Sequence, residues 1–106
     1  MIIVMTRLPV KPEFKEQFKE RVQEKFGEQG LTQEKGFVKM NILEPKNIPS
    51  MGENNTFIVE TYWETMEDFV AYTQSQSFAE AHRDLPPREW FAGHPTVEVF
   101  ELIKEK

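Results

Sequence analysis

Four short runs of β-branched and apolar residues alternate along this chain with two segments of helical periodicity, and this order limits the fold more than any other feature. The runs are residues 2–8, 37–43, 56–63 and 96–103. Each has the length and composition of a β-strand, and residues that favour turns stand between them. The pattern therefore predicts a sheet of four strands.

The first helical segment runs from Glu13 to Gly27. Its apolar side chains recur every four residues among Lys, Glu and Gln, as on one face of an amphipathic helix, and they are Phe14, Phe18, Val22 and Phe26. We interpret this stripe as part of the core. Gly27 or Gly30 is expected to end the helix.

The second helical segment lies between the third and fourth runs and is predicted to be broken into two pieces. Thr65 can cap the first piece, and Ser75 or Ser77 the second, because these side chains accept hydrogen bonds from the first backbone N–H groups of a helix. Proline cannot continue a helix, so the second piece must end by Pro86.

The resulting order of β, α, β, β, α, β is typical of the ferredoxin-like α+β fold, in which helices pack on one face of an antiparallel sheet. With 106 residues and no repeat or linker, residues 1–106 are expected to form a single domain. Both faces of the strands at 2–8 and 56–63 are largely apolar, which predicts a cover for the second face. We expect a homodimer, a dimeric α+β barrel; a monomer with an apolar sheet face is the alternative.

Composition argues against several classes of partner. The chain has 18 acidic and 13 basic residues, and the basic ones are scattered, so nucleic acid is not an expected partner. No apolar segment reaches the roughly 20 residues that a membrane helix needs, and the N-terminus lacks the features of a signal peptide, so a cytoplasmic location is expected. The absence of cysteine removes disulfides, thiolate metal sites and cysteine nucleophiles.

One of only two histidines, His82, ends the segment SQSFAEAH. On a helix it shares the apolar stripe with Phe78, Ala81 and Leu85, so it is predicted to point toward the gap between helix and sheet, on the buried face. A core side chain, a general base and a ligand of a metal or of haem iron all fit such a histidine. No second donor stands at a suitable spacing, which argues against a metal held by side chains alone.

Residues 59–82, VETYWETMEDFVAYTQSQSFAEAH, resemble the signature of the antibiotic biosynthesis monooxygenase superfamily of dimeric ferredoxin-like proteins. The ending SxxFxxAH is similar to that of the haem-degrading branch, the IsdG- and HmoA-like proteins. The similarity covers the whole chain in the order of its elements. Its specific part is this one segment.

The resemblance implies that His82 is the axial ligand of haem iron. It also implies that Thr6 takes the place of an asparagine that donates a hydrogen bond near the distal ligand, and Tyr72 that of a tryptophan that presses on the porphyrin. Thr6 has a shorter reach than asparagine, and Tyr72 a smaller ring than tryptophan. Further residues that could flank the ring, on fold grounds alone, are Phe69, Phe78 and Val4.

The function that the resemblance implies is haem degradation, with haem as cofactor and substrate, O2 as oxidant and an external electron donor. Because Thr6 and Tyr72 depart from the family pattern, a protein that binds haem without cleaving it is an alternative. A cofactor-free monooxygenase that acts on a quinol, with His82 as the base, is a third. Two loops each allow two interpretations: 44–55 is a flap or a tolerated surface loop, and His94 lies on the surface or lines a pocket mouth together with Trp90 and Phe91.

Overall fold

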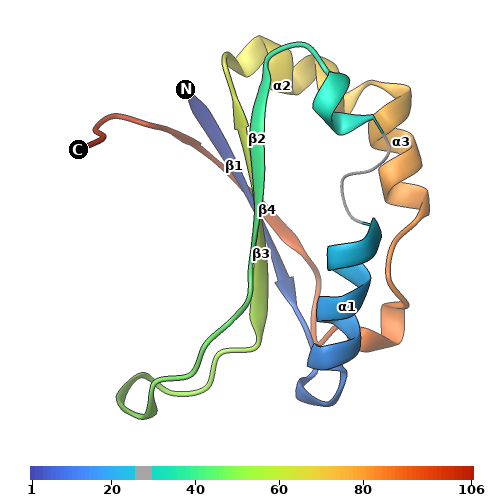
Figure 1. Ribbon diagram of the computed structural model, residues 1–106, viewed down its shortest axis with the longest axis vertical. Coiled ribbons are helices and arrows are strands. Elements are labelled where there is room, and N and C mark those ends of the chain that lie inside the picture. Colours follow the sequence, from blue (N-terminus) through green and yellow to red (C-terminus); the bar gives the residue numbers. More distant parts are fainter. Residues whose placement is uncertain (26–29) are drawn as a thin grey trace.

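The computed structural model describes residues 1–25 and 30–106 and joins its strands in one antiparallel sheet (Figure 1). The spatial order is β2-β3-β1-β4, which is that of the predicted ferredoxin-like fold. The strands are β1 (Ile2–Pro9), β2 (Phe37–Leu43), β3 (Thr56–Trp63) and β4 (Thr96–Glu101). The predicted strands are confirmed, and only the last is shorter than expected.

Three α-helices lie on the same face of the sheet, and the opposite face is open in the single chain (Figure 1). They are α1 (Lys15–Lys25), α2 (Met66–Thr73) and α3 (Gln76–Arg83). A 3-10 turn over Pro12–Phe14 leads into α1. Phe26 and Gly27 lie outside the described residues, and Gly30 precedes a 3-10 turn over Leu31–Gln33.

A side-chain cap starts each of the helices α2 and α3. Thr65 Oγ1 accepts a hydrogen bond from the backbone N–H of Asp68 at 3.1 Å, which starts α2. Ser75 Oγ accepts from the N–H of Phe78 at 3.1 Å and donates to the carbonyl of Tyr72 at 2.7 Å. Ser75 therefore ends one helix and starts the next, as the sequence predicts.

The core lies between the sheet and the helices and has two clusters. Alternate residues of β1 and β3 face the helices, because pairing places Leu8 opposite Phe57 and Ile2 opposite Trp63. The first cluster joins these strands to Phe18 and Val22 of α1. The second forms around Trp63, with Ile2, Val4 and Leu31.

The open face of the sheet is partly apolar, as predicted. Ile3, Met5 and Ile58 on it are half-buried by their strand neighbours alone, and Phe100 of β4 is exposed. The edge strand β4 pairs with β1, and all six of its residues are exposed. The predicted dimer would cover the open face; it stays a prediction.

Candidate functional site

Helix α3 places His82 in its last turn, on the same stripe as Phe78. The two rings are in contact, with centroids 3.9 Å apart. The predicted burial of His82 is wrong, however, because its side chain is exposed and no residue of α3 is buried. Helical spacing puts His82 next to Phe78, but the last turn of α3 is not packed into the core, and Leu85 beyond it is 53% exposed.

The imidazole of His82 is fixed in orientation by its own helix. Nδ1 lies 2.9 Å from the carbonyl oxygen of Phe78, one turn earlier. A carbonyl only accepts, so this contact requires the proton on Nδ1 and leaves the lone pair of a neutral ring on Nε2. In metal-bound histidines, the second ring nitrogen commonly donates to a backbone carbonyl or a carboxylate in this way. His82 can therefore act through Nε2, as a ligand or as a base.

On the sheet, Thr6 lies on the helix-facing side of β1. It is half-buried and pairs with Val59 on one side and Val97 on the other. Val97 and Val99 face the same side, because paired residues of antiparallel strands share a face, yet they are 59% and 40% exposed. The helix-facing side of the sheet is thus apolar and uncovered at β4. Sequence reasoning missed both valines, although their alternation with Glu98 was a signal that they share one face.

A chain of aromatic contacts connects His82 to the core. The ring of Phe78 meets Tyr72 edge-on at 5.4 Å, and Tyr72 lies 5.1 Å from Trp63, which is completely buried. Phe69 also contacts Trp63, at 5.9 Å. Ring contacts therefore link four of the predicted site residues to Trp63, directly for Tyr72 and Phe69 and through Tyr72 for Phe78 and His82.

Val4 and Tyr72 expose different amounts of surface. Val4 is only 4% exposed within the Trp63 cluster, so it presents almost no surface to a ligand. Tyr72 is half-buried, and burial, followed by the Glu34 carboxylate, raises the pKa of its phenol. Its hydroxyl therefore stays protonated at neutral pH.

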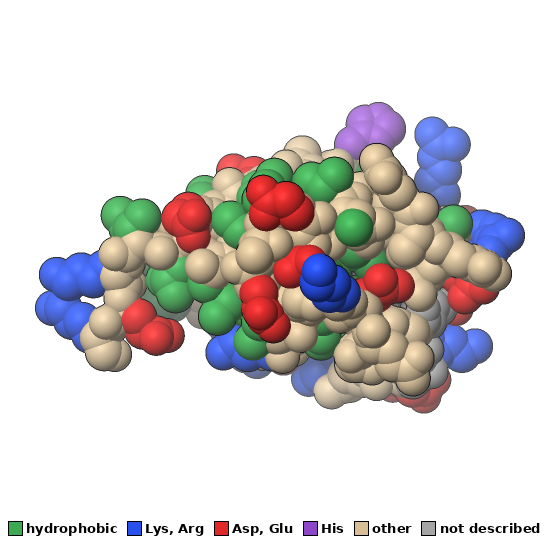
Figure 2. Space-filling view, turned by 90° about the horizontal axis from the view of Figure 1, so that it is seen from above, with side chains coloured by type: hydrophobic (Ala, Val, Ile, Leu, Met, Phe, Trp, Pro, Cys, Tyr) green, Lys and Arg blue, Asp and Glu red, His purple; other side chains and the backbone are tan. Residues whose placement is uncertain are grey.

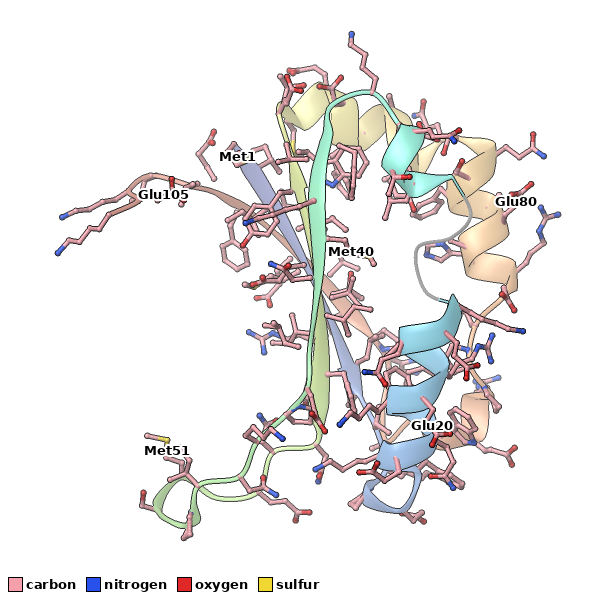
Figure 3. All side chains as sticks on the ribbon, viewed as in Figure 1. Met1, Glu20, Met40, Met51, Glu80 and Glu105 are labelled. Atoms are coloured by element: carbon pink, nitrogen blue, oxygen red, sulfur yellow. The ribbon has the colours of Figure 1, made fainter. Side chains whose placement is uncertain are left out.

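The remaining candidates lie elsewhere. His94 is exposed, while Trp90 stacks on Phe14 and Phe91 packs against Phe18 in the core. The connection 44–55 is closed by a bridge between Ile48 and Gly52 and extends away from the helices (Figure 1). Figure 3 shows its tip residue Met51 on the opposite side of the molecule from Glu80 of α3. The structure therefore does not place this loop as a flap over His82.

The surface of α2 has a hollow that lies apart from the predicted site residues. It is shallow, has a volume of about 340 Å³ and is lined by residues of α2 alone: Met66, Glu67, Val70, Ala71 and Gln74. Figure 2 looks onto this end of the molecule and shows hydrophobic, acidic and basic side chains mixed over the surface. None of the predicted site residues lines this hollow.

Residues 1–25 and 30–106 contain neither a metal-binding cluster nor a membrane-spanning helix. Within these ranges, no three His, Asp or Glu side chains lie close enough together to hold a metal ion. Over the same ranges, no helix has the length and apolar character needed to cross a membrane. Iron at His82 would thus need its other ligands from elsewhere.

The sequence and the fold both match known proteins. A family model described as antibiotic biosynthesis monooxygenase matches residues 1–84. The chain belongs to this monooxygenase family. The chain is 33% identical over 84 residues to the heme oxygenase (staphylobilin-producing) of Staphylococcus haemolyticus, in a match that covers 79% of this chain and 75% of the relative. The predicted resemblance is confirmed.

Solved structures share the fold of this monooxygenase over nearly its whole length. The heme-degrader MhuD of Mycobacterium tuberculosis, with two hemes bound in its active site, aligns with a TM-score of 0.76 at 20% identity, over 100% of this chain and 99% of that one. A Bacillus cereus protein provisionally named an antibiotic biosynthesis monooxygenase gives 0.74 at 20% identity, over 99% and 93%. At these identities the two structures support the fold of the monooxygenase and not its substrate.

Proposed function

We propose that this monooxygenase binds haem and cleaves the porphyrin with O2 and electrons from an external donor, which frees the iron. The observation that carries the proposal is the hydrogen bond from Nδ1 of the exposed His82 to the carbonyl of Phe78, which leaves the lone pair of the neutral ring on Nε2. The heme oxygenase of Staphylococcus haemolyticus and the haem-bound MhuD support the choice of ligand. The cytoplasm, where soluble reductants are available, is the proposed location.

The residues present fit a porphyrin better than a bare metal ion. A porphyrin brings four nitrogen ligands of its own, so the protein needs to add only one axial donor, and His82 is one. The faces of the ring are apolar and need apolar surface, which Phe78 offers in part and which Val97 and Val99 expose on the helix side of the sheet. When bound, haem would supply the redox-active iron and the carbon that is oxidised.

Each predicted side chain would have a distinct task. His82 would hold the iron through Nε2, with its ring orientation set by the Phe78 carbonyl. The Thr6 hydroxyl, half-buried on the helix side of β1, would donate a hydrogen bond within the pocket. Phe78 and Phe69 would exclude water from the ring. Val4 would not contact the porphyrin but would pack in the core cluster of Trp63.

One observation favours a second function, in which haem is held without being cleaved. Tyr72 stands where related proteins have the tryptophan that presses on the porphyrin. Its ring already packs against both Trp63 and Phe78, and a ring that keeps those contacts exerts little pressure on a ligand. With less distortion of the porphyrin, the protein would bind haem but would not cleave it.

A titration of the purified protein with haemin tests the ligand assignment. We expect a shifted Soret band for the unaltered protein and for His94→Ala, which removes the other, exposed histidine. His82→Ala should lose or change that spectrum. An identical Soret band in His82→Ala would rule out His82 as the ligand.

Aerobic reduction then separates cleavage from storage. With ascorbate and added catalase, loss of the Soret band and release of ferrous iron would support degradation. A Soret band that persists over hours would support the binding function instead. Catalase is needed because free peroxide destroys haem without the enzyme.

We also propose that a second copy covers the open face of the sheet. The half-buried Ile3, Met5 and Ile58 and the exposed Phe100 form an apolar surface there. Light scattering after size exclusion should give the mass of a dimer. Phe100→Lys should shift it toward monomer, whereas Val70→Lys, an equally exposed position on α2, should not; a monomeric mass for the unaltered protein contradicts the proposal.

A further inference from the structure

The C-terminal end of α3 is joined to α1 by one arginine. Nη2 of Arg21 donates to the Asp84 carboxylate at 3.0 Å and to the Asp84 carbonyl at 3.1 Å. Asp84 is the C-cap residue of α3 and comes two positions after His82. A cation here pairs with the carboxylate, satisfies a backbone carbonyl at the helix end and complements the helix dipole.

Among the described residues, few other contacts hold helix α3 in place. It has eight residues, none of them buried, and a helix of that length is not stable alone in water. Its first turn is held by the Ser75 cap and by the contact of Phe78 with Tyr72. The last turn, which contains His82, depends on what holds Asp84.

Helix α1, by contrast, is anchored. Phe18 and Val22, on either side of Arg21, are buried in the first core cluster. The Arg21 side chain is itself only 23% exposed, whereas that of Asp84 is 49% exposed. The ion pair therefore joins a fixed cation to the end of a less firmly held helix.

We propose that Arg21 is a positioning residue for His82: by holding the cap at Asp84, it keeps the last turn of α3, and with it the imidazole, in place. The expected effect of Arg21 on haem binding rests on the proposed function. Its expected effect on the last turn of α3 does not, because that effect is measured on the protein without ligand.

The geometry suits arginine better than lysine. The two N–H groups of Nη2 are held in the plane of the guanidinium and can each donate to one oxygen of Asp84, while a lysine ammonium is a point charge on a flexible stem. Because the pair is partly exposed, solvent screens it and its effect is modest. We expect removal of the charge to loosen the last turn of α3 by roughly fivefold in its opening equilibrium.

The test compares Arg21→Gln with Lys19→Gln. Lys19 lies on the same helix and makes an ion pair of similar length, 3.3 Å, but to Glu44 rather than to α3. Amide hydrogen exchange of residues 80–83 and the tautomer of His82, from nitrogen NMR, are measured without ligand. Haemin affinity is measured next.

Arg21→Gln should exchange about fivefold faster in the last turn of α3, lose the preference for the proton on Nδ1 and bind haemin about fivefold more weakly. Asp84→Asn should have a similar effect, Arg21→Lys an intermediate one and Lys19→Gln none. Unchanged exchange and tautomer in Arg21→Gln would overturn the proposal. So would weaker haemin binding with unchanged exchange, because Arg21 would then act on the ligand itself.

Failure of the proposed function has a different signature. If the unaltered protein does not bind haemin, the assignment of His82 as an iron ligand fails. The exchange and tautomer measurements still decide whether Arg21 positions the end of α3.

Discussion

Replacing Trp63 with phenylalanine should be the most costly conservative change in the neighbourhood of His82. Trp63 is completely buried and contacts the rings of Phe37, Phe69 and Tyr72 at centroid distances of 5.6, 5.9 and 5.1 Å. Its Nε1 also donates a hydrogen bond to Thr61 Oγ1 at 2.9 Å. Phenylalanine keeps an aromatic ring but loses the hydrogen bond and part of the ring volume.

The loss in the free energy of unfolding that we expect for Trp63→Phe has two contributions. Loss of the hydrogen bond to Thr61 costs about 1 kcal/mol net. Truncation of a buried Trp to Ala lowers the free energy of unfolding by about 3–5 kcal/mol. The change of Trp63 to Phe removes less side-chain volume, so we expect the lost packing to cost about 1–2 kcal/mol. The free energy of unfolding should therefore fall by about 2–3 kcal/mol, which lowers the Tm by roughly 10 °C or more in a domain of this size.

Urea unfolding followed by circular dichroism measures this change, with Trp90→Phe as the control. Trp90 is half-buried and stacks on Phe14 at 6.0 Å, so its replacement should cost about 1 kcal/mol. The slope of free energy against urea should stay the same in both variants. A loss at Trp63 no larger than that at Trp90 would refute the view that the rings below His82 are supported by Trp63.

Three further changes test local features. Because the pKa of Tyr72 is raised, the folded state binds the phenol proton more tightly than the unfolded state does. The stabilisation from this difference is fully present below about pH 10 and is lost as the pH rises further. Tyr72→Phe should make the free energy of unfolding fall less steeply over that range, as measured by urea titrations at several pH values. Gly36→Ala should lower stability by at least 1 kcal/mol more than Gly93→Ala, as measured by thermal unfolding. Gly36 has φ +80° and an added Cβ would overlap the Asp68 side chain, whereas Gly93 has no positive φ and an added Cβ there would make only an ordinary contact with Pro9; roughly equal losses would contradict this. Ser75→Ala should cost about 1 kcal/mol and reduce the helical circular dichroism, since it removes the cap of α3; no change in either signal would count against the cap.

The elements could be predicted because their signals are local. Alternation and β-branching mark β2 and β3 to the residue, and the caps at Thr65 and Ser75 depend on atoms only three positions away. The strand order then follows from few alternatives, because short connections and antiparallel pairing limit the topology.

The exposure of the candidate site could not be predicted in the same way. Helical spacing shows that His82 shares a stripe with Phe78, but not whether another element covers that stripe. Val97 and Val99 are exposed because the helices do not extend over β4, which is a property of the tertiary packing. Arg21 and Asp84 are 63 positions apart in the sequence. Many other charged residues could have paired with either of them, so the sequence alone does not predict this ion pair.

The position of β4 after the three helices along the chain has a consequence for the order in which the proposed site is assembled. A ribosome releases the chain from its N-terminal end, so α1, α2 and α3 emerge before β4 does. His82 is then already available, but Val97 and Val99 join the helix side of the sheet only after β4 has paired with β1. A nascent chain that ends before Thr96 would thus contain His82 but lack the apolar strand β4. An apolar ligand would then bind only after β4 has joined the sheet.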